Sequence, residues 1–404
     1  MSASTQSAKP PFWRNVNVLR VLAQIGAVAG VVALLWWLIN NLLTGLDEQG
    51  IPFGLGFWDD PAGFTVRDSS FERTQPIWEL IVFVGVKNTL ASAVVGITIA
   101  VVLGILIGVA RLSDNWIVKK LAALYVETFR NIPPLVIIIF VGSALFVNNA
   151  RLNAFTAGSE PNLFKIPGSD SNFMILSRSR LGFPSFANDG NTGLFWIIML
   201  VALAAAVGVW VWRTRYNVET GQPHHRVAYS FVTLLVIGVV AFVALGGPLR
   251  WSWPAVSESG RLIEGGLTTN DGYVALTLAL GLYTASHIAE IIRGSILAVH
   301  RGQSEAANAL ALSGFQRYRF VILPQAFRIA IPSIINQFLN LTKNTSLAVV
   351  VAYPDVTQAI RTAIGNGQPA TQLILALMLV YLTFSLLTSL VLNIVNRRFQ
   401  VVGR

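Results

Sequence analysis

Eight long apolar segments constrain the fold of this sequence more than any other feature. Each has at least about 18 residues, the length that a helix needs to cross roughly 30 Å of hydrocarbon. The segments lie at Val21–Leu43, Ile81–Ala110, Val126–Phe146, Leu194–Val211, Val227–Leu245, Tyr273–Ile292, Phe327–Val351 and Leu373–Val395. They are apolar on every face and do not alternate with polar residues, so a strand-based membrane barrel is disfavoured. We therefore predict an all-α integral membrane protein with about eight transmembrane helices.

The composition and the positions of the charges support this prediction. Only 12% of the residues are charged and 54% are hydrophobic, which is too apolar for a soluble chain of this size. With the N-terminus placed inside, the inner segments hold sixteen Lys and Arg residues, and the longer outer segments hold nine. This bias predicts a multi-pass protein with cytoplasmic N- and C-termini. The net charge of +10 is then an orientation signal, and we expect no nucleic-acid partner.

The sequence offers little for covalent chemistry. It has no cysteine and only four histidines, and the adjacent pair His224 and His225 is a weak metal signal without further ligands. We therefore expect no catalytic residue, no metal site and no enzyme activity in this chain. A phosphate-binding loop of the form G-x-x-x-x-G-K-[ST] is also missing, so ATP is not expected to bind here.

A polar segment between the sixth and seventh apolar segments has the pattern of two short helices. It runs from Gly302 to Gly314, continues through Phe315 to Leu323, and is followed by Pro324. Ser304 can cap the first helix, Gly314 suits a left-handed residue that ends it, and Pro324 is expected to stop the second. Such a compact element at the membrane face is one that a soluble partner could push.

This segment resembles the cytoplasmic EAA loop of importer permeases of the ATP-binding-cassette class. The resemblance rests on Glu305-Ala306-Ala307 and on Val321-Ile322-Leu323-Pro324. It implies a coupling helix that docks on a separate ATPase, which binds ATP and Mg²⁺. The implied coupling residues are Glu305, Ala306, Ala307, Ala311, Gly314, Leu323 and Pro324. Ala311 stands where the family usually has a glycine, so the bend is expected to move to Gly314.

Three further motifs narrow the resemblance to the polar amino-acid branch of these permeases. They are Phe129-Arg130-Asn131-Ile132-Pro133-Pro134, the stretch from Tyr283 to Gly294, and Lys343-Asn344-Thr345-Ser346-Leu347. The first outer loop, with Gly54-Leu55-Gly56-Phe57, is similar to that of the larger permease of general L-amino-acid importers. The resemblance implies a type I importer permease fold in the bacterial inner membrane and L-amino acids as cargo. It also implies a second homologous permease, two ATPase subunits and a periplasmic amino-acid-binding protein.

The resemblance and the apolar pattern together predict the domain organisation. Residues 1–78 form an N-terminal transmembrane helix with a periplasmic loop, and residues 79–400 form the permease domain. That domain is interrupted at about 149–270 by a periplasmic loop and an inserted helical hairpin. Residues 301–325 form the EAA coupling loop.

The seventh apolar segment carries a polar stripe that is a candidate cargo pathway. Asn336, Asn340, Lys343 and Asn344 recur at three- and four-residue steps, together with Ser333 and Gln337. A lysine that faces a cavity can attract a cargo carboxylate, although the same groups could instead hold helices together.

Arg130, Asn131 and His287 are further pathway candidates. Pro133 and Pro134 are expected to break or kink the third segment, directly after Arg130 and Asn131. Glu290 and Arg293 are spaced to pair on one helix face, and we interpret them as structural. A gradient-driven secondary amino-acid transporter remains the alternative function. It would need a buried ion-binding acid, and Glu127 and Glu290 both lie near the predicted inner surface.

Overall fold

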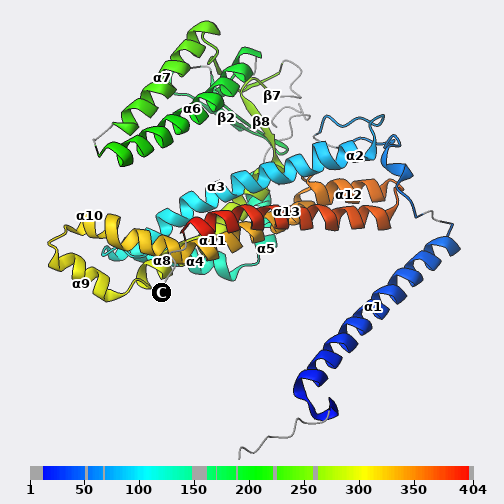
Figure 1. Ribbon diagram of the computed structural model, residues 1–404. Helices are drawn as coiled ribbons and strands as arrows, with labels where there is room; N and C mark the ends of the chain where they lie inside the picture. Colours follow the sequence, from blue (N-terminus) through cyan, green and yellow to red (C-terminus); the bar gives the residue numbers. More distant parts are fainter. Residues whose placement is uncertain are drawn as a thin grey trace, which may run out of the picture.

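The computed structural model describes residues 12–50, 53–66, 69–147, 162–169, 171–187, 190–221, 225–257 and 263–399. Most of these residues are helical (Figure 1). The α-helices are α1 (Val16–Glu48), α2 (Ile77–Glu79), α3 (Lys87–Ala110), α4 (Trp116–Asn131), α5 (Pro134–Gly142), α6 (Gly190–Thr220), α7 (Arg226–Ala244), α8 (Asp271–Leu297), α9 (Arg301–Ala309), α10 (Gly314–Arg317), α11 (Leu323–Asn344), α12 (Val356–Gly365) and α13 (Ala370–Phe399). The shorter helical turns are η1 (Phe12–Arg14), η2 (Gly56–Trp58), η3 (Leu80–Val86), η4 (Ser143–Val147), η5 (Tyr318–Ile322) and η6 (Thr345–Val351).

The predicted number of membrane spans agrees with the structure. Among the described residues, seven helices are long and apolar enough to cross a membrane, or eight if one bent pair counts as a span. The bent pair corresponds to the third predicted segment. Its two halves, Trp116–Asn131 and Pro134–Phe146, meet at 106°. The predicted break at Pro133 and Pro134 is therefore confirmed, because a proline at the start of α5 cannot continue the hydrogen bonding of α4.

Helix α8 is the centre of the transmembrane core. It packs against α3, α4, α5 and α11, and 67% of its apolar window is buried. The buried residues of α3 are all small, namely Thr89, Ser92, Ala93, Gly96, Ala100, Gly104 and Gly108, and Gly104 and Gly108 lie directly against α8. Small residues spaced by four positions let two helices approach closely in a bilayer, where packing rather than water exclusion drives association. The α3–α8 pair is thus specified by shape.

The predicted first outer loop packs onto one end of this core. Its side chains Phe64 and Phe71 are buried in one cluster with Leu80, Ile360 and Leu373. The cluster joins the loop to η3, α12 and α13 (Figure 1). In contrast, α1 has no buried residue, and it projects away from the rest of the molecule.

The inserted region contains strands that the sequence pattern did not indicate. These are β1 (Asn162–Lys165), β2 (Asn172–Leu176), β3 (Arg180–Phe183), β4 (Ser185–Phe186), β5 (Trp251–Ser252), β6 (Ala255–Val256), β7 (Ile263–Glu264) and β8 (Leu267–Asn270). Four of them form an antiparallel sheet in the order β1-β2-β3-β8, and the others form two short pairs. Since β8 runs directly into α8, this sheet connects the α6–α7 hairpin to the core (Figure 1).

Candidate functional site

The predicted coupling segment is a helical hairpin at one end of the molecule (Figure 1). Helix α9 begins after His300, whose Nδ1 accepts a hydrogen bond from the backbone N–H of Gly302 at 3.1 Å. The expectation that Ser304 caps this helix is therefore wrong, because Ser304 lies one turn inside it. Glu305 and Ala306 are exposed on α9, whereas Ala307 is buried against the rest of the hairpin.

The bend of the hairpin lies at Ala311 and not at Gly314. Ala311 has a left-handed backbone with φ of 54°, and the N–H of Leu312 donates to the carbonyl of Ala307 at 3.1 Å. This hydrogen bond closes the end of α9 as a left-handed cap does, at a conformational cost of about 1–2 kcal/mol for a residue with a Cβ. Gly314 instead starts α10 after Ser313, which forms a capping box with Gln316. The expected shift of the bend to Gly314 is wrong.

Pro324 does not stop the second helix of the hairpin. Helices α10, η5 and α11 follow one another without a break, and residues Gly314–Val351 form one candidate span. The segment η5 is a π-helix that ends immediately before Leu323 and Pro324. A π-turn changes the hydrogen-bond register, and this accommodates a residue that has no N–H to donate. The α9–α10 hairpin is consequently continuous with the helix that carries the polar stripe.

Side-chain hydrogen bonds hold the hairpin closed. The Arg317 guanidinium donates to Asn308 Oδ1 at 2.9 Å, and the Gln325 amide donates to Gln303 Oε1 at 3.0 Å. Several large apolar side chains remain exposed around this end of the molecule. They are Leu310, Phe315, Tyr318 and Phe320. A closed hairpin with exposed apolar side chains has the features of a docking element.

The polar stripe on α11 faces away from the protein core. Ser333, Asn336, Asn340 and Lys343 are exposed, while Gln337 and Asn344 are partly buried. Amides and an ammonium group are costly in contact with lipid tails. This face of α11 therefore suits a cavity or a neighbouring polypeptide better than hydrocarbon.

A second group of pathway candidates lies where α4 meets α8. Arg130 and Asn131 are exposed at the end of α4, immediately before the bend. Arg130 is close enough to His287 for its charge to act on the imidazole. His287 packs edge-on against Tyr283, and its buried Nε2 has no hydrogen-bond partner in the described part of the chain. The structure thus brings Arg130 and His287 together, whereas Asn336, Asn340 and Lys343 belong to α11.

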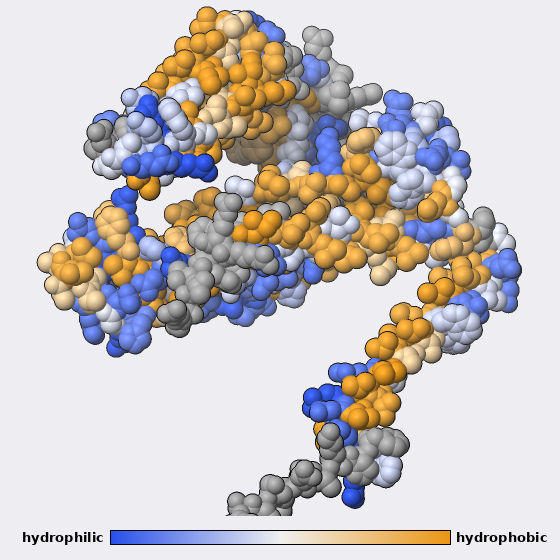
Figure 2. Space-filling view, in the orientation of Figure 1, coloured by the Kyte–Doolittle hydropathy of each residue, from blue (hydrophilic) through white to orange (hydrophobic). Residues whose placement is uncertain are grey.

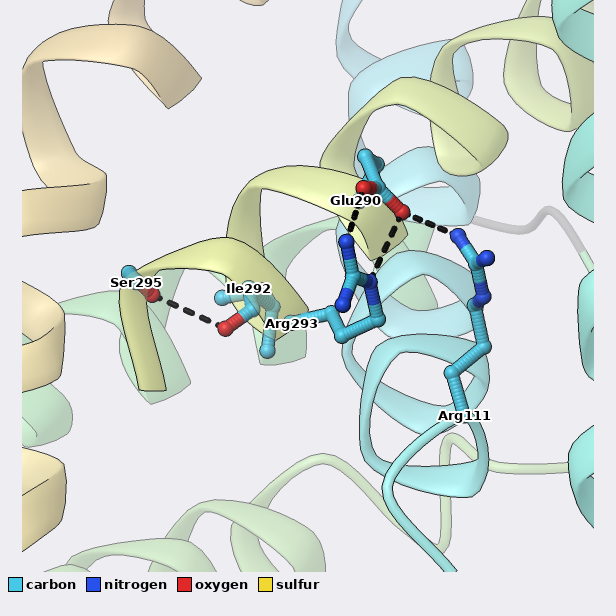
Figure 3. A network of polar contacts seen from close by, with 5 residues as sticks. All are labelled: Arg111, Glu290, Ile292, Arg293 and Ser295. Atoms are coloured by element: carbon cyan, nitrogen blue, oxygen red, sulfur yellow. Dashed lines mark hydrogen bonds and ion pairs between the residues drawn. The ribbon is translucent and has the colours of Figure 1, made fainter. Parts of the chain in front are cut away.

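Glu290 and Arg293 form the ion pair that the spacing predicted. Arg293 donates to the Glu290 carboxylate at 2.5 and 3.1 Å (Figure 3). Arg111 is a second partner that the sequence did not indicate. It follows the last residue of α3 and pairs with the same carboxylate across the α3–α8 contact (Figure 3). Because the partners lie 179 residues apart, no local spacing rule could have found this contact.

Asp355 is a buried acid that the sequence reasoning missed. It is the N-cap of α12, where its Oδ1 accepts from the N–H of Gln358 at 2.8 Å and its Oδ2 accepts from the Tyr381 hydroxyl at 3.3 Å. Burial raises the pKa of this carboxyl to about 6, although these hydrogen bonds oppose the shift. The pattern of Asp355 three residues before Gln358 is a capping signal that could have indicated it.

The described residues contain no group of three or more potential metal ligands. His224 lies outside the described residues, so the adjacent pair with His225 is not placed.

Comparison with known proteins identifies the family. Residues 227–401 match the family of binding-protein-dependent transport system inner membrane components. The chain is 35% identical to the general L-amino acid transport system permease protein AapQ of Rhizobium johnstonii, over 95% of this chain and 93% of the relative. It is 36% identical to the putative amino-acid ABC transporter permease protein YhdX of Escherichia coli K12, over 96% of each chain. A third relative is the glutamate/glutamine/aspartate/asparagine transport system permease protein BztB of Rhodobacter capsulatus, 33% identical over 97% of this chain and 95% of the relative.

These alignments span nearly the whole of each relative. The apolar spans show a multi-pass membrane protein, and the family match is the basis for assigning the type I importer permease fold. The chain belongs to the family of binding-protein-dependent transport system inner membrane components, among the permease subunits of ATP-binding-cassette transporters.

Proposed function

We propose that this permease subunit carries L-amino acids inward across the bacterial inner membrane, driven by an ATPase that docks on the α9–α10 hairpin. One observation carries the mechanism. The hairpin runs without a break into α11, so a displacement of the hairpin moves the helix that bears the polar stripe. ATP-driven movement at one end can thereby open and close a cavity lined by α11.

Some of the coupling residues would contact the ATPase, and the others maintain the shape of the hairpin or connect it to α11. Glu305 and Ala306 are exposed on α9 and are positioned to touch the ATPase, with Leu310 and Phe315 as apolar neighbours. Ala307 and Ala311 support the shape of the hairpin through the hydrogen bond that closes α9. Leu323 and Pro324, with Gly314 at the start of α10, connect the hairpin to α11.

The partners of this chain follow from the same proposal. The exposed polar face of α11 requires a second homologous permease to complete a cavity, and two ATPase subunits would bind ATP and Mg²⁺, for which this sequence has no glycine-rich loop. A periplasmic amino-acid-binding protein would deliver the cargo. The orientation expected from the basic residues places both termini in the cytoplasm and the β-strands outside.

The charge and hydrogen-bonding capacity of the side chains indicate which part of the cargo each one would bind. An amino acid presents a carboxylate that Lys343 or Arg130 can attract, and the amides of Asn336, Asn340, Asn344 and Asn131 can bind both of its ends. His287 offers a ring nitrogen that has no other partner in the described chain. The names of the relatives support amino acids as the class of cargo.

The coupling assignment is tested by charge reversal in proteoliposomes that contain this chain and its partner subunits. We expect Glu305→Lys to abolish ATP-dependent uptake of labelled amino acids and to release the ATPase from the membrane. Glu219→Lys is the matched control, because Glu219 is also exposed at the inner end of a helix but lies on α6, outside the hairpin. Uptake that persists in Glu305→Lys with the ATPase still bound would refute the coupling role.

The pathway assignment is tested separately at Lys343. Loss of one charge-assisted contact corresponds to about a tenfold change, so Lys343→Gln should raise the KM for uptake by about tenfold while Lys343→Arg stays close to the parent. ATPase binding should be unchanged in both variants. An unaltered KM in Lys343→Gln would remove this residue from the pathway.

A further inference from the structure

The inner end of the α6–α7 hairpin carries two arginines that stack reciprocally across the two helices. Arg213 of α6 lies over the ring of Tyr229 of α7, with its guanidinium carbon 4.0 Å from the ring centroid. Arg226 of α7 lies over the ring of Trp210 of α6 at 5.2 Å. Each cation is therefore held by an aromatic ring of the opposite helix. Contact with the rings limits where the two guanidinium groups can move, so the two cations are positioned before any ligand arrives.

Several hydrogen-bond donors of Arg213 and Arg226 have no acceptor within the described chain. The Nε of Arg213 is buried and has no hydrogen-bond partner there, and the Oγ of Ser230 is in the same state. Among the described residues, no carboxylate forms a salt bridge with Arg213 or Arg226. Within the described chain, the guanidinium of Arg226 donates one hydrogen bond, a long one of 3.5 Å to the Thr214 hydroxyl. The buried Nε of Arg213 therefore lacks an acceptor, and the exposed guanidinium of Arg226 has donors that a ligand can use.

The surroundings indicate what kind of molecule supplies that acceptor. Figure 2 shows hydrophilic residues at this end of the hairpin, while the length of both helices is hydrophobic. A pocket of about 510 Å³ lies beside Arg226 and is lined by His225, Arg226, Val227, Ala228 and Phe231. Its lining changes from charged to apolar along α7. That gradient matches a phospholipid, which joins an anionic headgroup to hydrocarbon tails.

We propose that this end of the hairpin is a binding site for the phosphate of an anionic phospholipid, held by the guanidinium groups of Arg213 and Arg226. Planar guanidinium groups bind phosphate oxygens in pairs, which a scattered surface charge does not do. The site lies outside the coupling hairpin and the polar stripe, so it is separate from transport chemistry. It would fix the inserted hairpin at the membrane surface.

The test measures the phospholipid that the full-length chain retains. The protein is reconstituted in vesicles of equal phosphatidylcholine and phosphatidylglycerol, re-extracted in mild detergent, and weighed with its bound lipids by native mass spectrometry. We expect the parent to retain phosphatidylglycerol selectively, and Arg213→Gln and Arg226→Gln each to reduce that retention by about tenfold. Arg226→Lys keeps the charge but not the planar fork, so it should retain the fold and still lose several-fold of the retention.

Arg215→Gln is the matched control. Arg215 is an exposed cation at the same end of α6 that stacks on no aromatic ring within the described chain, so its loss removes the same charge without touching the stacked pair. Equal losses in Arg215→Gln and Arg226→Gln would overturn the proposal, because general charge attraction would then explain the binding. Equal retention in all variants would overturn it too.

A second arm distinguishes lipid phosphate from free phosphate. The same protein in phosphatidylcholine vesicles is incubated with inorganic phosphate and weighed in the same way. Arginine-dependent binding of phosphate, without selective retention of phosphatidylglycerol in the first arm, would overturn the lipid as the ligand. Retention of phosphatidylglycerol alone supports it.

Discussion

A methyl group added at Gly104 tests whether shape specifies the contact between α3 and α8. A Cβ at this position would lie 2.6 Å from Cγ2 and 2.7 Å from Cβ of Ile288, and 3.2 Å from the carbonyl oxygen of Ala285. Ile288 is fully buried and β-branched, so it has no alternative rotamer with which to move away. The two helices must separate to accept Gly104→Ala.

The size of the effect follows from two opposing terms. Overpacking a tight core costs about 1–3 kcal/mol, whereas replacing glycine by alanine within a helix gains about 0.5–1 kcal/mol. The net expectation for Gly104→Ala is a loss of about 1–2 kcal/mol in the free energy of unfolding, which lowers the Tm of a chain of 404 residues by about 1–2 °C. Intrinsic fluorescence of the eleven tryptophans reports the transition in detergent, whereas thiol-reactive dyes are unsuitable because the chain has no cysteine.

Gly96→Ala is the matched control on the same helix. Its new Cβ would lie 3.4 Å from the tip of the Leu341 side chain, which is ordinary contact. The control should melt at or slightly above the Tm of the parent. If Gly104→Ala also melts with the parent, or if Gly96→Ala loses as much, close glycine-mediated packing does not hold α3 to α8.

Two further predictions concern polar contacts of the core, one at the Glu290 ion pairs and one at Asp355. Glu290→Gln leaves Arg111 and Arg293 without their shared carboxylate and should lower the free energy of unfolding by about 1–3 kcal/mol. Arg293→Gln leaves the Arg111 pair intact and should therefore lower it by less. Equal melting temperatures for the parent and both variants would contradict this. Asp355→Asn removes a buried acid whose pKa of about 6 exceeds its ordinary 3.8, and asparagine still caps α12. The folded parent holds this proton more tightly than the unfolded chain, so its stability should fall by up to about 3 kcal/mol as the pH rises from about 4 to 6 and then stay level. Melting curves across this pH range should show the Tm of the variant rising relative to that of the parent. Parallel pH profiles would refute the raised pKa of Asp355.

The length of the apolar segments made the transmembrane helices predictable. Each of the eight apolar segments corresponds to a helix or to the bent pair, and the two prolines located the bend. The pairing of Glu290 with Arg293 was also predictable, because three-residue spacing on a helix is a local rule. In contrast, the predicted cap at Ser304 and the predicted left-handed residue at Gly314 were wrong, because the structure has His300 and Ala311 in these roles. Residue preferences at helix ends are weak, and the hydrogen bond from Leu312 to Ala307 outweighs the preference for glycine.

Hydrophobic length and local spacing are properties of consecutive residues. They were therefore enough to predict a multi-pass helical membrane protein, and the motifs indicated the permease family. The three-dimensional structure was needed for every feature that depends on distant residues. It paired Arg111 with Glu290, buried Asp355 beneath Tyr381, and joined the coupling hairpin to the polar stripe through one continuous helix. It also formed a sheet from strands on either side of the α6–α7 hairpin. These contacts depend on packing in three dimensions, which no pattern of neighbouring residues encodes.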